Sequence, residues 1–261
     1  MEDSQPSLLK ACHESLVKTF EWIANVTPTG ALEHCDGITI GKSGLASSSF
    51  NIVFALDLPK SLSGVSEAIR RLFMTSGIPW ELITTPNISD AIEPLIQEFS
   101  LIKADVEPGM VLDSLPNIIP ASPPELEIKQ VSQVEELLTF LRVGMLGFGD
   151  PSGSLLEPLA KGLSESASFR GGAYLGYVNG VPVSTSLRFS VGKIAAIYFV
   201  ATMPEFRRRG YGEAMTWRAT LDGRKDGCEG GFLQASAMGR PIYEKMGYRK
   251  IVDYEIWKPK E

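Results

Sequence analysis

One segment of the chain combines a hydrophobic run with three consecutive arginines and two glycines. It reads Ile197-Tyr-Phe-Val-Ala-Thr-Met-Pro-Glu-Phe-Arg-Arg-Arg-Gly-Tyr-Gly212. The pattern predicts a buried strand, a loop and the start of a helix, where backbone N–H groups lack partners and the helix dipole attracts anions. Gly210 and Gly212 allow close backbone approach, and arginines donate charge-assisted hydrogen bonds to phosphate oxygens. The segment therefore predicts a pyrophosphate-binding site.

A dinucleotide-binding (Rossmann) fold is the alternative for a glycine-rich loop before a helix. Its fingerprint places the first glycine directly after the strand, a third glycine in the helix and an acidic residue at the end of the next strand. Here several residues separate the strand from Gly210, Met215 stands at the third glycine position, and the next strand reads Phe232-Leu-Gln-Ala. The Rossmann interpretation is therefore disfavoured.

The C-terminal part of the chain predicts the elements that position this loop. Hydrophobic periodicity and turn residues indicate where its helices and strands begin and end. Asn179-Gly180 is a strong hairpin signal between two of the strands. A short helix should end at Gly247, as glycine commonly follows a helix C-terminus. The expected strands are 126–130, 172–178, 181–189, 193–201, 231–234 and one or two within 248–258, and the expected helices are 134–146, 155–163, 210–225 and 240–246.

The N-terminal part predicts a similar mixture of helices and strands. Its expected helices are 8–20, 61–75 and 89–99, and its expected strands are 37–41, 50–56, 79–84, 101–106 and 110–114. Ser89 is the expected N-cap of the last helix. The two parts share an outline of strands, helix, strand, helix and final strands, which suggests a duplication.

A proline-rich stretch separates the two parts. Residues 116–125 contain four prolines, which are incompatible with a helix interior or a central strand. We therefore expect an N-terminal domain at 1–115, a linker at 116–124 and a C-terminal domain at 125–261.

Two motifs of the C-terminal part resemble the GNAT superfamily of acyl-CoA-dependent N-acyltransferases. Arg207-x-x-Gly210-x-Gly212 follows a strand ending Val200-Ala-Thr202, and Pro241-Ile-Tyr-Glu-Lys-Met-Gly-Tyr248 follows it in the expected order. The resemblance covers about half of the chain. It implies an α+β GNAT fold with a mixed sheet, and it implies that the protein transfers an acetyl group from acetyl-CoA. The N-terminal part resembles a degenerate GNAT half, so the expected architecture is a tandem.

The resemblance assigns roles by position. The strand at Phe199–Thr202 should part from its neighbour and bind the pantetheine arm through Val200 and Thr202, and a backbone N–H near Val200 should stabilise the oxyanion. Tyr243 should protonate the departing thiolate as general acid. The implied cofactor-binding residues are Phe199, Val200, Ala201, Thr202, Arg207, Arg208, Arg209, Gly210, Tyr211, Gly212 and Ser236.

The chain departs from the family pattern at two positions. Ser236 stands where many members have asparagine, and Ala196 stands where histone-type members carry a glutamate base. The general base that deprotonates the acceptor amine is therefore not assigned. The alternatives are Asp150, Glu205, a water relay and an amine that arrives neutral. Cys228 lies among acidic residues that would raise its thiol pKa, so we interpret it as structural rather than nucleophilic.

Composition excludes several other classes. The net charge of −6 and the pI near 5.2 disfavour a nucleic-acid partner. The acidic N-terminus and the short apolar runs predict no signal peptide and no membrane span, hence a cytoplasmic protein. Two histidines and three scattered cysteines predict no metal site.

The acceptor is predicted only by class. We expect a small-molecule primary amine as the partner, while the sequence predicts no oligomeric state. The loop at 57–64 of the N-terminal part lacks both arginines and a G-x-G pattern, so that part should not bind CoA and should instead wall the acceptor cleft. The alternative function is a non-catalytic CoA-binding sensor or scaffold.

Overall fold

The computed structural model describes residues 4–118, 120–149, 156–166 and 169–260. The chain forms two compact units, and each is built from two chain segments. Unit 1 comprises Met1–Ser15 and Met110–Arg249, and unit 2 comprises Leu16–Gly109 and Lys250–Glu261. This division differs from the expected linear one, with its boundary at 116–124, because the last strand of the chain pairs within unit 2.

Unit 1 is built on a mixed sheet whose strands follow the order β5-β10-β9-β8-β7-β6. Strands β6 to β9 are antiparallel neighbours, whereas β10 runs parallel to β9. The strands are β5 (Leu101–Leu112, of which 110–112 lie in unit 1), β6 (Leu126–Val131), β7 (Gly171–Val178), β8 (Val181–Val191), β9 (Ile194–Thr202) and β10 (Gly230–Gln234).

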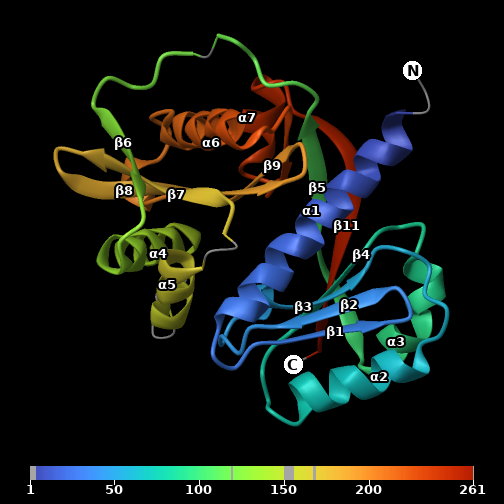
Figure 1. Ribbon diagram of the computed structural model, residues 1–261. Helices are drawn as coiled ribbons and strands as arrows, with labels where there is room; N and C mark the ends of the chain where they lie inside the picture. The colour runs from blue at the N-terminus through green and yellow to red at the C-terminus, as the bar shows by residue number, and fades with distance from the viewer. Residues whose placement is uncertain (1–3, 119, 150–155, 167–168, 261) are drawn as a thin grey trace. The chain divides into compact units, whose positions relative to one another are not determined.

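Helices cover both faces of this sheet (Figure 1). One face carries α6 (Tyr211–Asp222) and the short α7 (Arg240–Lys245), and the other carries α4 (Val134–Phe148) and α5 (Leu156–Glu165). Beneath α6 and α7 lies a hydrophobic core that includes Met215, Tyr243 and Tyr248. The core thus joins the helix that follows the arginine loop to the predicted tyrosine segment.

Unit 2 is also built on a mixed sheet. Its strand order is β1-β2-β3-β4-β11-β5, with β3 and β4 parallel and β11 antiparallel to β4. The strands are β1 (Ala31–Cys35), β2 (Ile38–Lys42), β3 (Asn51–Ala55), β4 (Glu81–Thr84), residues 101–109 of β5, and β11 (Arg249–Pro259). The helices are α1 (Ser4–Val26), which enters this unit at Leu16, α2 (Ser63–Ile69) and α3 (Glu93–Glu98).

Most predicted elements are present, with three differences. Strand β1 was not predicted, and it is a partly exposed strand without the usual apolar alternation. The expected strands 101–106 and 110–114 form one strand, β5, because Gly109 lets the side chains of Val252 and Tyr254 pack against the backbone. Residues 249–259 form the single strand β11, which agrees with the predicted one or two strands within 248–258.

The third difference concerns Ser89, which does not cap a helix. The helical segment begins as a 3-10 turn, Ser89–Ile92, whose N-cap is Ile88. The Ser89 hydroxyl instead donates to the Glu255 carboxylate at 2.6 Å and lies 3.2 Å from the Thr85 carbonyl oxygen. Because the Ser89 hydroxyl donates to the buried Glu255 carboxylate, it does not act as a helix N-cap.

No helix among the described residues is long and apolar enough to span a bilayer.

Candidate active site

The parallel strands β9 and β10 part at the predicted acyl site. They pair only from Ile194↔Gly230 to Ile197↔Leu233. Strand β9 continues to Thr202, while β10 ends at Gln234. Along residues 199–202, no described strand pairs with β9 on the β10 side, so backbone N–H and C=O groups there are left for another partner.

A bulge in β9 lies at the same point. On β8 only one residue separates Thr185 from Leu187, whereas their partners on β9 are Ala201 and Tyr198. Phe199 has a φ of 54°, which is unusual for a non-glycine residue. The Thr185 hydroxyl donates to the Phe199 carbonyl oxygen at 2.8 Å and holds the bulge. Bulges re-aim backbone groups next to active sites, and here the re-aimed residues are Phe199 and Val200.

Two glycines of α4 let this helix lie directly against the bulge. A Cβ at Gly144 would lie 2.0 Å from ring carbon Cε1 of Phe199, and one at Gly147 would lie 2.8 Å from the Ala201 Cβ. The Phe199 ring also contacts Phe140 and Phe148, with ring centroids 5.4 and 5.3 Å away. The side chain of Phe199 therefore packs against α4, and only its backbone belongs to the predicted acyl site.

The three arginines after β9 have different partners. Arg207 donates to the Thr202 carbonyl oxygen at 3.1 Å and to the Gly147 carbonyl oxygen at 2.7 Å, so it ties the end of β9 to the end of α4. Arg209 is exposed, donates to the Glu205 carbonyl oxygen and lies over the Phe206 ring. Arg208 is exposed as well. Two of the three guanidinium groups are thus at the surface, and the third braces the loop.

The loop backbone contains two residues in the left-handed conformation. Arg208 and Gly210 have φ values of 63° and 79°, and left-handed residues in succession with right-handed ones turn N–H groups into an anion-binding concavity. The first hydrogen bond of α6 is Ala214 N–H to Gly210 O. The N–H groups of residues 211–213 therefore precede the helical ladder and point out of its positive end.

Gly212 and Tyr211 contribute to this site in opposite ways. A Cβ at Gly212 would meet only the Thr202 hydroxyl, at 3.9 Å, so this face of the helix end is open. Tyr211 is buried, and its hydroxyl donates to Glu125 at 2.8 Å. Tyr211 thus anchors α6, and its hydroxyl is engaged by Glu125 within the protein.

Tyr243 of α7 lies in the core beneath α6. It is 8% exposed, and Val200 packs against the same hydrophobic cluster. Burial raises the pKa of Tyr243 to about 12, against a hydrogen bond from Thr216 that lowers it. The phenol is therefore protonated throughout the neutral range, as a general acid must be.

Ser236 precedes α7 and lies beside this tyrosine. Its hydroxyl accepts the Gly239 N–H at 3.2 Å. A Cβ at Gly239 would lie 2.8 Å from the Tyr243 ring and 3.4 Å from the Ser236 oxygen. Ser236 therefore shapes the turn into α7.

The candidates for a base or nucleophile have less distinctive surroundings. Asp150 lies outside the described residues, and Glu205 is exposed in the 3-10 turn Pro204–Phe206. Ala196 is fully buried in β9. Cys228 is buried, and burial, more than its acidic neighbours, raises the pKa of its thiol. The described residues include no group of three or more His, Cys, Asp or Glu side chains suited to a metal ion.

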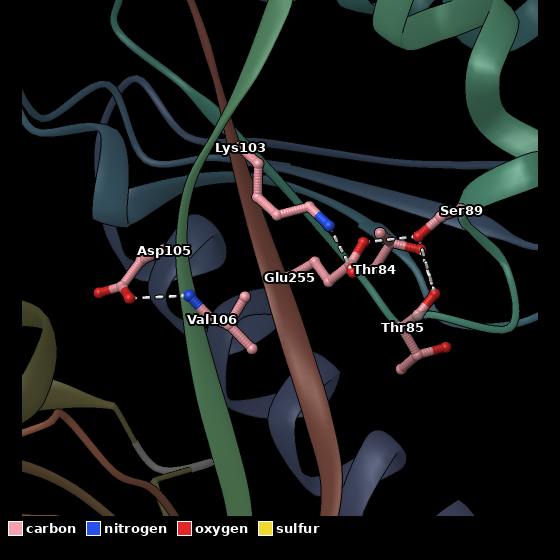
Figure 2. A network of polar contacts seen from close by, with 7 residues as sticks. All are labelled: Thr84, Thr85, Ser89, Lys103, Asp105, Val106 and Glu255. Atoms are coloured by element: carbon pink, nitrogen blue, oxygen red, sulfur yellow. Dashed lines mark hydrogen bonds and ion pairs between the residues drawn. The ribbon is translucent and has the colours of Figure 1, made fainter.

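The parallel pair of unit 2 lacks the opening seen in unit 1. Strands β3 and β4 remain paired up to their last residues, Ala55↔Thr84. Just beyond, a polar network closes around Glu255, whose carboxylate accepts hydrogen bonds from Ser89 and from Lys103 at 2.7 Å (Figure 2). Burial would raise the pKa of Glu255, but these bonds lower it overall. Both carboxylate oxygens are thus engaged within the protein.

Several residues of the site were not predicted from the sequence. Gly144, Gly147 and Thr185 support the bulge through contacts between distant segments, which single-sequence patterns do not reveal. Thr216 could have been noticed, since it lies one helical turn after Gly212 and on the same face.

Comparisons with known proteins agree with this geometry. A family model described as an acetyltransferase (GNAT) domain matches residues 135–251. No curated protein is significantly similar to the chain.

Solved structures share the fold over most of the chain. A GCN5-related N-acetyltransferase from Kribbella flavida matches with a TM-score of 0.68 and 16% identity, over 89% of this chain and 90% of that one. A GCN5-related N-acetyltransferase from Sphaerobacter thermophilus matches with a TM-score of 0.56 and 15% identity, over 85% and 79%. A tandem GNAT protein from the clavulanic acid biosynthesis pathway matches with a TM-score of 0.58 and 11% identity, over 90% and 85%.

At these identities the structural matches establish a shared fold, and the family model establishes the domain. The protein has the mixed α/β fold of GNAT acyltransferases, a family that uses acetyl-CoA, and residues 135–251 match the GNAT acetyltransferase domain.

Proposed function

We propose that the protein transfers an acetyl group from acetyl-CoA to the primary amine of a small molecule by direct attack. The observation that carries this proposal is the parting of β9 from β10 after Ile197↔Leu233, together with the bulge at Phe199 and Val200. An extended chain such as pantetheine can pair with the exposed edge of β9 as an additional strand would. The thioester then lies where the bulge re-aims a backbone N–H.

The loop after β9 supports the assignment of the other end of CoA. Its left-handed residues and the start of α6 direct several N–H groups outward, which suits the pyrophosphate. In this proposal Arg208 and Arg209 add charge at the surface, while Arg207 holds the loop through Thr202 and Gly147. Gly212 leaves the space that the phosphates occupy.

The chemical step needs an oxyanion donor and an acid. The Val200 N–H stabilises the negative charge that develops on the acyl oxygen when the amine attacks. Tyr243 then protonates the sulfur as the C–S bond breaks. Both histidines lie in α1 and β1, outside residues 135–251, so the segment that matches the GNAT domain offers no histidine to activate a nucleophile. Direct transfer therefore needs fewer catalytic groups from this chain than a mechanism through a covalent acyl-enzyme.

We further propose that unit 2 is a GNAT-like half without a CoA site. Its parallel strands stay paired to their ends, and the loop at 57–64 carries no arginine.

Thiol release from acetyl-CoA tests the proposed activity. The assay uses a panel of small primary amines and, in parallel, peptides with a free N-terminal amine, and calorimetry measures CoA binding separately. We expect CoA binding and turnover with small amines. Tight CoA binding without turnover on any acceptor would instead support the sensor function, and turnover on peptides alone would make the small-molecule acceptor wrong.

A further inference from the structure

The peptide unit between Phe199 and Val200 has its carbonyl group bound within the protein. The Thr185 hydroxyl donates to the Phe199 carbonyl oxygen at 2.8 Å, and Thr185 is fully buried in β8. The same peptide unit carries the Val200 N–H, which is the oxyanion donor of the proposed reaction. One hydrogen bond from β8 therefore acts on the group that would hold the acyl oxygen.

The direction of the Val200 N–H follows from this bond. The peptide bonds among the described residues are all trans, and in a planar trans peptide the C=O and the N–H point in opposite directions. Because the Phe199 carbonyl oxygen accepts from Thr185 of β8, the Val200 N–H points away from that strand. On the other side of β9, the pairing with β10 has already ended, at Ile197↔Leu233. The N–H is thus directed to the opened edge of β9.

The bulge explains why a side chain supplies this bond. On β9 two residues, Phe199 and Val200, stand opposite the single residue Ser186 of β8. A bulge of this kind disrupts the ladder locally, and Phe199 has a φ of 54°. The Thr185 hydroxyl therefore fixes a peptide plane that the regular ladder does not.

A bound carbonyl group also strengthens the N–H of its own peptide. Hydrogen bonds in a chain polarise one another, so a donor to the C=O increases the positive charge on the N–H. A donor that is already oriented stabilises an oxyanion more effectively, because it need not reorganise when the charge develops. Thr185 contributes both effects from a buried position.

We propose that Thr185 is a positioning residue of the acyl-transfer step: through the Phe199 carbonyl group it orients and polarises the Val200 N–H that stabilises the oxyanion. This inference rests on the proposed function of Val200. Thr185 exchanges no proton. Because it acts through the peptide, its loss should lower kcat more than it weakens cofactor binding.

The preceding residue of β8 makes the equivalent bond further along β9. The Ser184 hydroxyl donates to the Ala201 carbonyl oxygen at 2.7 Å and lies 2.8 Å from the Thr202 hydroxyl. The Ala201–Thr202 peptide carries the Thr202 N–H, which belongs to the expected pantetheine site. Loss of the Ser184 hydroxyl should therefore weaken acetyl-CoA binding, whereas loss of the Thr185 hydroxyl should slow the chemical step.

Substitutions of Thr185 test the proposal. Thr185→Val keeps the shape of the side chain and removes the hydroxyl. We expect kcat to fall by about tenfold, less than the roughly 10²–10³-fold cost of removing an oxyanion donor itself. Calorimetry should give an acetyl-CoA affinity close to that of the wild type. Thr185→Ser keeps the hydroxyl and should retain most of kcat.

Two neighbours on β8 serve as matched comparisons. Ser184→Ala should weaken acetyl-CoA binding by about fivefold, as for loss of one hydrogen bond, with little change in kcat at saturation. Ser186→Ala removes a buried hydroxyl that donates to the Met215 carbonyl oxygen of α6 at 3.0 Å. It should leave kcat and acetyl-CoA affinity near their wild-type values.

A second readout does not depend on turnover. Phe199-Val200 is the only Phe-Val pair in the sequence, so protein labelled with ¹³C-carbonyl phenylalanine and ¹⁵N-valine gives one carbonyl-coupled amide signal in NMR. Acetyl-CoA without an acceptor should shift the Val200 amide proton downfield, and CoA, which lacks the acyl group, should shift it less. In Thr185→Val the Phe199 carbonyl carbon should move already in the free protein, and the response of Val200 to acetyl-CoA should shrink.

The outcomes separate this inference from the proposed function. If acetyl-CoA moves the Val200 signal no more than CoA does, Val200 is not the oxyanion donor, and the role of Thr185 is wrong with it. If Val200 responds to acetyl-CoA but folded Thr185→Val keeps the wild-type kcat and the full response, only the role of Thr185 is overturned. An equal loss of kcat in Thr185→Ser would also overturn it, because the effect would then be one of packing. Thr185→Ala makes the same comparison if Thr185→Val does not fold.

Discussion

Gly144 of α4 lies under the ring of Phe199, so close that a methyl group there would fall 2.0 Å from a ring carbon. Phe199 is the left-handed residue of the β9 bulge. The position of this helix and the conformation of the bulge are therefore coupled through one glycine.

The first prediction follows from this contact. In an unconstrained helix, replacing glycine by alanine gains about 1 kcal/mol. At this position overpacking should dominate, and Gly144→Ala should lower the free energy of unfolding by about 1–3 kcal/mol. Displacement of the bulge should also weaken acetyl-CoA binding. Denaturant unfolding and calorimetry measure the two effects, with the exposed neighbour Leu146→Ala as control. If the free energy of unfolding and the acetyl-CoA affinity both stay at their wild-type values, α4 accommodates the added methyl group without moving β9.

The second prediction concerns the general acid. Tyr243→Phe keeps the ring in its core and removes only the hydroxyl, so stability and CoA affinity should hardly change. Turnover should fall by roughly 10²–10⁴-fold, the usual contribution of general acid–base catalysis. Initial-rate kinetics should show intersecting lines, as direct transfer requires both substrates to be bound together. Parallel lines would contradict direct transfer, and near-full turnover would contradict the role of Tyr243.

The third prediction separates ligand binding from folding at the pyrophosphate loop. A Cβ at Gly212 meets no atom closer than 3.9 Å within the protein, so Gly212→Ala should not lower stability. It should fill part of the phosphate space and weaken acetyl-CoA binding at least tenfold, about 1.4 kcal/mol. Gly64 occupies the same second position of α2 in unit 2, also in open space. Gly64→Ala should leave CoA affinity unchanged, and an equal loss in both variants would exclude a specific phosphate site at Gly212.

The fourth prediction is the stoichiometry of binding. Of the two parallel pairs whose register is described, β9–β10 opens at its end, while β3 and β4 stay paired up to Ala55↔Thr84. Isothermal titration should therefore give one CoA per chain. Gly212→Ala should weaken that single site without revealing another. Two equivalent sites would mean that unit 2 also binds CoA.

Local signals in the sequence were sufficient for the elements around the loop. The Asn179-Gly180 turn has positive φ at both residues, and Gly247 has a φ of 92° after α7, as their residue types predict. These features depend on neighbours in the chain, and they were predicted correctly.

The features that were not predicted depend on distant segments. Pairing of β11 with β4 cannot be derived from either strand alone. The positive φ of Phe199 runs against the preference of an aromatic residue, and it is maintained by Thr185 and by the packing of α4. Composition likewise gave no indication that Arg207 would bind two carbonyl oxygens rather than remain exposed.

The last prediction concerns the pH dependence of stability in unit 2. Burial, together with Asp105 and Glu81, raises the pKa of Glu107 from 4.5 to about 7, against the opposing charge of Lys258. A carboxyl group whose pKa is higher in the folded state binds more protons there than in the unfolded state, so stability should fall as the pH rises through this interval. Glu107→Gln cannot ionise and should remove this component.

Denaturant unfolding of wild type and Glu107→Gln between pH 4.5 and 8 measures the effect. The variant should gain stability relative to wild type as the pH rises, and the difference should level off once Glu107 is ionised, above about pH 8. Glu127→Gln, at an exposed carboxylate of β6, should run parallel to wild type. A difference between Glu107→Gln and wild type that stays constant with pH would mean that Glu107 ionises equally in both states, and that the strands around it leave it open to water.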